Sequence, residues 1–148
     1  MRALIVTNMY PSPAHPALGS FVRDQVQALQ RTGQAEIAVF SFAPGGAGAY
    51  LRGAAGLRRS LRGQRFDIVH AHFGLTEWPA LAVPARAHLV TLHGTDLADP
   101  RSRAITLAGA RRMDLVATVS APLAATVPRW ATRRPVAVLP CGVDLHRF

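Results

Sequence analysis

The chain has 148 residues, the size of one ordinary domain, and 49% of them are hydrophobic, which argues against a disordered chain. Its formal net charge is +9, and every Lys or Arg position is arginine. This charge suits an anionic partner, either nucleic acid, a phosphorylated substrate or an acidic membrane surface, and does not choose among them. The single cysteine, Cys141, excludes an intrachain disulfide, and no neighbour in the sequence resembles a base that would activate it.

Six short runs of the sequence are apolar on both faces. Such runs are typical of strands that are buried between two layers of helices. Helical segments separate them, so the pattern predicts an α/β fold with a mostly parallel sheet of six or seven strands and helices on both faces. The runs lie at residues 3–7, 37–40, 68–71, 89–92, 115–119 and 136–139.

Helix signals lie between these runs. Ser20 is predicted to cap a helix over residues 21–30. Residues 50–65 predict a basic amphipathic helix, and two more helices are expected over residues 77–85 and from Ser120 to about residue 127. The basic helix either touches an anionic membrane or a lipid-linked acceptor, or packs on the sheet and solvates its arginines. These arginines are Arg52, Arg58, Arg59, Arg62 and Arg65.

No apolar run approaches the roughly 20 residues that a membrane-spanning helix needs. The start of the chain lacks the pattern of a signal peptide, because only Arg2 precedes a very short apolar run. We therefore expect a cytoplasmic protein. Peripheral contact of residues 50–65 with the inner face of the membrane is an alternative that the sequence leaves open.

The candidate site consists of the residues that follow the apolar runs, because ligands of an open α/β sheet bind at the carboxyl ends of its strands. Polar residues and glycines are concentrated there, as a binding cleft requires. After the third, fourth and fifth runs these candidates are His72, Phe73, Gly74, His93, Gly94, Thr95, Asp96 and Ser120.

Gly19 and Ser20 end the loop that follows the first run, at the start of a predicted helix. The free backbone N–H groups and the positive end of a helix dipole form a seat for a phosphate, and glycine lets an anion approach closely. A simple helix cap explains the pair equally well. The loop has neither the GxGxxG fingerprint nor the lysine of a P-loop, which argues against a standard NAD site or an NTPase.

His93 directly follows an apolar run and precedes a glycine. An imidazole there can donate a hydrogen bond into the cleft or shuttle a proton near pH 7, although a lone histidine is more often structural. His70 and His72 are two residues apart, so they point to the same face of a strand. No cluster of Cys or carboxylates completes a ligand set, so no metal is expected. We predict a buried, hydrogen-bonded His70 and a cleft-facing His72.

Two further features are interpreted as structural. Ser120 lacks the G-x-S-x-G elbow of a nucleophile and is predicted to cap a helix. The arginines around Trp130 are interpreted as a solvated surface, because aromatic residues that would stack on bases are sparse and no nucleic-acid-binding motif is present. No nucleic-acid partner is therefore expected.

Five segments follow one another in an informative order. A loop with Tyr10-Pro11 and Gly19-Ser20-Phe21 comes first, and the others lie at residues 66–72, 91–96, 114–120 and 139–144, with a terminal Phe148. In this order and spacing they resemble glycosyltransferase family 4, a group of retaining enzymes of the GT-B architecture. The resemblance spans nearly all of the chain.

The resemblance implies two Rossmann-like, doubly wound domains that face each other across a cleft, with residues 1–148 as the N-terminal, acceptor-side domain. Gly19 and Ser20 would lie near the diphosphate of a nucleotide-sugar donor, and His93 near the scissile bond. The acceptor, which is a saccharide, a lipid-linked molecule or a small molecule, would contact the other candidates after the third to fifth runs. No cofactor beyond this co-substrate is implied. A hinge to the donor-binding domain would begin near residues 140–148.

The chain departs from the family pattern at three points. Gly19-Ser20 stands where many members have paired glycines, Cys141 stands where asparagine is common, and the donor-binding domain with its glutamate pair is absent from this chain. We therefore expect no useful turnover from the chain alone. Two alternatives stay open: a stand-alone module that binds a saccharide or a phosphorylated ligand, and a basic nucleic-acid-binding α/β domain.

Overall fold

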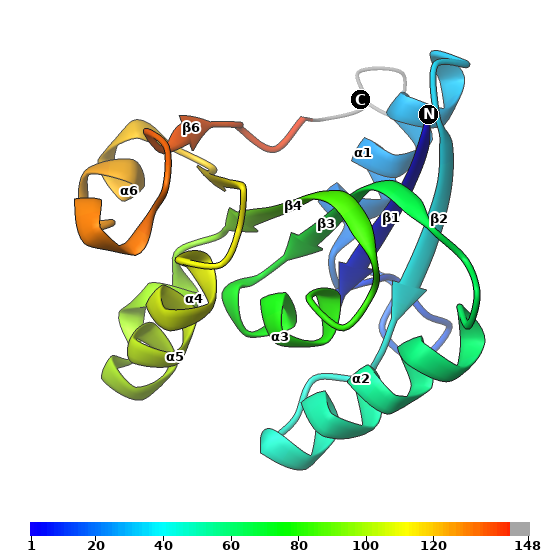
Figure 1. Ribbon diagram of the computed structural model, residues 1–148, viewed down its shortest axis with the longest axis horizontal. Coiled ribbons are helices and arrows are strands. Elements are labelled where there is room, and N and C mark those ends of the chain that lie inside the picture. Colours follow the sequence, from blue (N-terminus) through cyan, green and yellow to red (C-terminus); the bar gives the residue numbers. More distant parts are fainter. Residues whose placement is uncertain (143–148) are drawn as a thin grey trace.

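The computed structural model describes residues 1–142, which form one α/β sheet with its helices (Figure 1). All the strand pairs are parallel, and the strand order is β2-β1-β3-β4-β5-β6. This confirms the predicted parallel α/β sheet. The strands are β1 (Arg2–Thr7), β2 (Glu36–Ser41), β3 (Phe66–His72), β4 (Ala85–Leu92), β5 (Leu115–Thr118) and β6 (Ala137–Val138).

The direction of strand addition reverses beside β1, because β2 lies on one side of it and β3 on the other. In open parallel sheets the loops diverge at such a point and leave a crevice at the carboxyl ends of the strands. Thr7 pairs with His72 at this end of β1 and β3. The loop after β1 and the end of β3 therefore meet where a ligand is expected.

Helices cover both faces of the sheet. Leu4 and Val6 pack in the larger core with α2, α3 and α5, whereas Ile5, which points the other way, packs with Val22 and Val26 of α1. Figure 1 shows α2, α3 and α5 along one side of the sheet and α1 on the other. The helices are α1 (Ser20–Arg31), α2 (Ala47–Ser60), α3 (Glu77–Ala80), α4 (Thr95–Ala98), α5 (Pro100–Ala110) and α6 (Ala121–Ala125), with short 3₁₀ turns η1 (Gly74–Thr76) and η2 (Arg129–Ala131).

Several helix bounds differ from the predictions. The helix expected over residues 77–85 ends at Ala80, since Pro84 interrupts it and β4 begins at Ala85. The basic helix runs over Ala47–Ser60 and excludes the last two of its arginines. No helix was predicted over α5, because it buries Thr106 and Gly109 and lacks a continuous apolar stripe.

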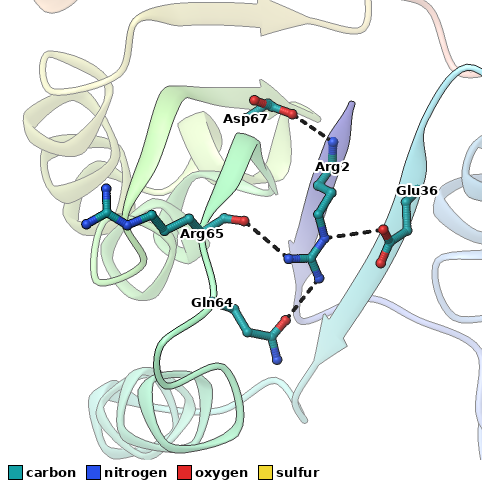
Figure 2. Close-up of polar contacts among 5 residues, drawn as sticks. All are labelled: Arg2, Glu36, Gln64, Arg65 and Asp67. Carbon is teal, nitrogen blue, oxygen red and sulfur yellow. Dashed lines mark hydrogen bonds and ion pairs between the residues drawn. The ribbon is translucent and has the colours of Figure 1, made fainter.

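Polar contacts join the amino ends of β1, β2 and β3 (Figure 2). The Arg2 backbone N–H donates to Oδ2 of Asp67 at 2.8 Å, and its guanidinium donates to Oε1 of Gln64 at 3.2 Å and to the carbonyl oxygen of Arg65 at 3.5 Å. The Arg2 Nε also lies 3.3 Å from Oε2 of Glu36. This pair is solvated and contributes only about 0–1 kcal/mol. The network aligns the strands at the edge opposite the candidate site.

None of the helices within residues 1–142 is long and apolar enough to cross a lipid bilayer. The residues of the predicted hinge beyond Gly142 lie outside the described part of the chain.

Candidate functional site

The start of α1 and the segment after β4 meet at the carboxyl edge of the sheet. The Phe21 ring lies 4.9 Å from the His93 ring, measured between centroids. Gly19 and Ser20 directly precede Phe21, so the two candidate segments from distant parts of the sequence lie side by side. The sequence-based expectation that Gly19 and His93 share one edge of the sheet is confirmed.

Gly19 is required by the backbone at the N-terminus of α1. It has a φ of 64°, in the left-handed region that favours glycine, and a Cβ at this position would collide with the carbonyl group of Met9. Gly19 is also the N-cap, and its carbonyl oxygen accepts the Val22 N–H at 2.9 Å. The prediction that Ser20 caps this helix is therefore wrong, because Ser20 is its first helical residue.

Three histidine rings stand in a row on the α1 side of the sheet. The centroids of His70 and His72 are 4.3 Å apart, and those of His72 and His93 are 5.5 Å apart in a stacked arrangement. His70 Nε2 hydrogen-bonds to Oγ1 of Thr91 at 2.8 Å, as predicted for a buried histidine. His72 is only 1% exposed, so it does not face an open cleft as expected, and its Nδ1 lies 3.3 Å from Nε2 of His93.

All three imidazoles are neutral near pH 7. Burial lowers the pKa of His70 to about 4 and that of His72 well below its ordinary value, and the neighbouring histidines add to both shifts. Burial also lowers the pKa of His93, although the charge of Asp96 opposes this. Since the facing nitrogens of His72 and His93 hydrogen-bond, one carries the proton and the other accepts it, and the tautomers of the two rings are coupled.

Asp96 lies beneath the site and holds its backbone. Its carboxylate is fully buried and accepts the N–H groups of Gly74 at 3.1 Å, His93 at 3.1 Å and Gly94 at 2.8 Å. These bonds join the end of β3 to the turn after β4, where Gly94 has a φ of 108°. The predicted acceptor residue Asp96 is thus placed to position other groups, whereas Thr95 beside it is exposed.

Glu77 is a buried carboxyl group next to this turn that sequence reasoning did not single out. Burial raises its pKa to about 10, with a further contribution from Asp96, so the side chain is protonated at neutral pH. Neither carboxyl oxygen has a hydrogen-bond partner within residues 1–142. α5 packs closely here, because a Cβ on Gly109 would collide with the Glu77 carboxyl group. The only sequence signal was an acidic residue in the first turn of a short helix.

The turn after β3 is also closely packed. Phe73 has a φ of 83°, and it is the one non-glycine residue with positive φ in the described chain. A Cβ on the next residue, Gly74, would collide with the side chain of Thr106 on α5. Phe73 and Gly74 were predicted as acceptor contacts. The structure buries Gly74 and gives it a packing role, because its lack of a side chain permits the approach of α5, whereas Phe73 is half-buried.

The end of the described chain returns to the same edge. The thiol of Cys141 lies 3.9 Å from Nδ1 of His93, so the fold brings an imidazole to this cysteine that no sequence neighbour supplies. Burial raises the pKa of the Cys141 thiol, which therefore stays protonated. Ser120 follows β5 and caps α6 as predicted, because its hydroxyl oxygen accepts the Leu123 N–H at 3.4 Å.

Within residues 1–142 no three His, Cys, Asp or Glu side chains are arranged to hold a metal ion. The expectation that the chain uses no metal stays a prediction.

The family model for glycosyltransferase family 4 matches residues 4–147. The chain belongs to this family. A search of curated proteins found no match for the family 4 chain. Among solved structures it resembles a sucrose-phosphate synthase from Thermosynechococcus elongatus, with a TM-score of 0.63 and 12% identity over 97% of this chain and 91% of that chain. At this identity the likeness concerns the fold alone, and it confirms the Rossmann-like α/β fold; the assignment as a glycosyltransferase rests on the family model.

Proposed function

We propose that this family 4 domain is the acceptor-side half of an enzyme that transfers a sugar from a nucleotide-sugar donor to an acceptor with retention of the anomeric configuration. The observation that carries the proposal is the junction of α1 and the turn after β4, where Phe21 contacts His93. It brings a helix N-terminus, suited to a diphosphate, beside a neutral imidazole, suited to a sugar hydroxyl.

In this proposal the N-terminus of α1 stabilises the leaving diphosphate. The positive end of the helix dipole opposes the charge that develops as the glycosidic C–O bond breaks, whereas the space beside Gly19 itself is filled by the Met9 carbonyl group. The acceptor oxygen forms its bond to the anomeric carbon on the same face of the sugar, and its proton passes to the departing phosphate oxygen. This half of the enzyme needs to supply no base for that step.

His93 has a positioning role in this scheme. Its imidazole is neutral, and its Nε2 pairs with Nδ1 of His72. When Nε2 of His93 accepts the proton of His72, Nδ1 of His93 carries the N–H and can donate it to a ligand. Asp96 orients the same turn through its backbone N–H groups. In the proposal the acceptor lies over the part of this edge that solvent reaches, where Thr95 is exposed and Phe73 and Ser120 are half-buried.

The isolated chain is expected to have no useful turnover, since transfer requires a second wall to bind the donor and exclude water. The test is to express the full reading frame, supply a panel of nucleotide sugars and acceptors, and determine the anomeric configuration of the product by NMR. A product of inverted configuration contradicts retention. Saccharide binding without transfer favours the binding module, and turnover by residues 1–148 alone contradicts the half-enzyme proposal.

Peripheral membrane contact through residues 50–65 is a separate proposal. Its support is that all five arginines of this segment are exposed. Leu57, however, is fully buried and Leu61 packs against the core, so that of the segment's leucines only Leu51 is available to a lipid surface. Equal partitioning of the chain into neutral and acidic vesicles at low salt would reject this contact.

A further inference from the structure

An apolar groove lies between α2, the η1–α3 segment and α5, on the side of the sheet opposite α1. It has a volume of about 580 Å³. The side chains that form it come from three separate parts of the sequence, and Tyr50 contributes a phenolic hydroxyl group. The main lining residues are Tyr50, Leu51, Ala54, Leu75, Trp78 and Ile105.

Three large apolar side chains at this groove are exposed to solvent. Leu51 is 72% exposed, Ile105 is 49% exposed and Trp78 is 39% exposed. They belong to α2, α5 and α3, so helix packing alone gathers them into one patch. Exposed apolar residues that are grouped in this way, rather than scattered singly, indicate a surface that binds a ligand, a membrane or another protein.

One end of the groove lies at the carboxyl edge of the sheet, where the proposed transfer site is. Gly45 and Gly46 follow β2, and Leu75 follows β3. The Tyr50 hydroxyl accepts a hydrogen bond from Nδ2 of Asn8 at 3.0 Å, and Asn8 directly follows β1. A molecule with its apolar part in the groove therefore has its other end near the crevice beside β1 and β3.

Three arginines lie close to residues that line the groove. The Arg112 guanidinium lies over the Trp78 ring, 5.1 Å from its centroid. Arg101 lies one helical turn before Ile105, and Arg52 is next to Leu51; all three arginines are exposed. The acidic residue at the start of α5, Asp99, is engaged in capping that helix. Such a rim is complementary to an anionic head group.

We propose that this groove binds the apolar chain of an anionic amphiphile, and that this amphiphile is the acceptor. The first part rests on the groove and its charged rim, and the second rests on the proposed function. The alkyl chain and the head group of the ligand contribute separately to its affinity. The contribution of the alkyl chain depends on its length, and that of the head group depends on its charge.

The test uses the 148-residue chain with Trp130→Phe, which leaves Trp78 as its single tryptophan. Titration with decyl phosphate below its critical micelle concentration is expected to shift the Trp78 emission to shorter wavelength and to saturate at one equivalent. Butyl phosphate has the same head group without the long chain, and decyl maltoside has the chain with a neutral head. We expect no saturation with butyl phosphate and weaker binding of decyl maltoside.

Substitutions separate the groove from the rest of the surface. Leu51→Gln and Ile105→Gln should each weaken decyl phosphate binding by about tenfold, because each removes apolar contact area. Leu29→Gln is the matched control, since Leu29 is 39% exposed on α1 and on the other face. Arg101→Gln should weaken decyl phosphate binding by about threefold and leave decyl maltoside binding unchanged.

Several results would overturn the proposal: no saturable binding by the Trp130→Phe chain, equal losses in Leu51→Gln and Leu29→Gln, or association with phosphatidylglycerol vesicles but not with monomeric decyl phosphate. The last result would assign the surface to membrane docking instead. Binding is measured without a donor, so it does not depend on sugar transfer. If the 148-residue chain binds decyl phosphate but the full-length protein transfers no sugar, the groove is confirmed as a binding site and the proposed function is refuted.

Discussion

Replacing Asp96 by alanine tests how much the site depends on one buried carboxylate. The change removes the acceptor for three backbone N–H groups. The bond to Gly74 is buried, so that donor stays unsatisfied, at a cost of about 1–3 kcal/mol. The other two donors, on His93 and Gly94, are partly buried and regain some hydrogen bonding to water. We expect a total loss of about 3–4 kcal/mol in the free energy of unfolding.

The assay is urea and thermal unfolding of the 148-residue chain, in which this loss lowers the Tm by about 10 °C. Asp99→Ala is the matched control, because this exposed cap of α5 accepts one backbone N–H and its loss costs about 1 kcal/mol. Asp96→Asn keeps the shape of the side chain but turns an amide NH₂ toward at least one backbone N–H. Its loss in the free energy of unfolding should lie between those of Asp96→Ala and Asp99→Ala. Equal stability of Asp96→Ala and Asp99→Ala would refute the role given to Asp96.

Three further predictions concern the site and its support. In the full-length enzyme, His93→Ala should lower kcat by roughly 10²–10³ with little change in Tm, and wild-type turnover would remove His93 from the mechanism. Gly19→Ala should destabilise the chain more than Gly33→Ala, because both have positive φ but only Gly19 meets the Met9 carbonyl; equal unfolding midpoints would contradict this. Glu77 is protonated in the folded chain up to a pKa of about 10 and ionises near 4.5 when unfolded, so its contribution to stability falls as pH rises through this window. Glu77→Gln should therefore become more stable relative to wild type from pH 5 to pH 9 in urea unfolding, and a constant difference would show that Glu77 is not protonated.

The strands and the edge that carries the site could be predicted from sequence. A sheet covered by helices on both faces requires runs such as Leu4 to Val6, which are apolar at every position, and these runs are visible without any knowledge of packing. The cap of α6 was predictable for a similar reason, since Ser120 hydrogen-bonds within its own helix turn.

Side-chain environments were harder to predict because they depend on partners that are distant in the sequence. Ser20 was chosen as a cap by residue type, but the loop after β1 passes so close that only Gly19 fits at that position. His72 was expected to face the cleft, yet His70 and His93 enclose it on either side. The two-residue period of a strand correctly predicted that His70 and His72 share one face of the sheet, but it could not predict how deeply His72 is buried.

The sequence by itself thus determined the alternation of strands and helices, the parallel sheet and the edge where the loops meet, because each depends on residues that are neighbours in the chain. Tertiary structure alone decided that Asp96 is a buried support, that Glu77 stays protonated, and that Leu51, Trp78 and Ile105 form one patch. The physical reason is that burial and electrostatic shifts depend on which elements pack together in space, and these elements lie many residues apart along the chain.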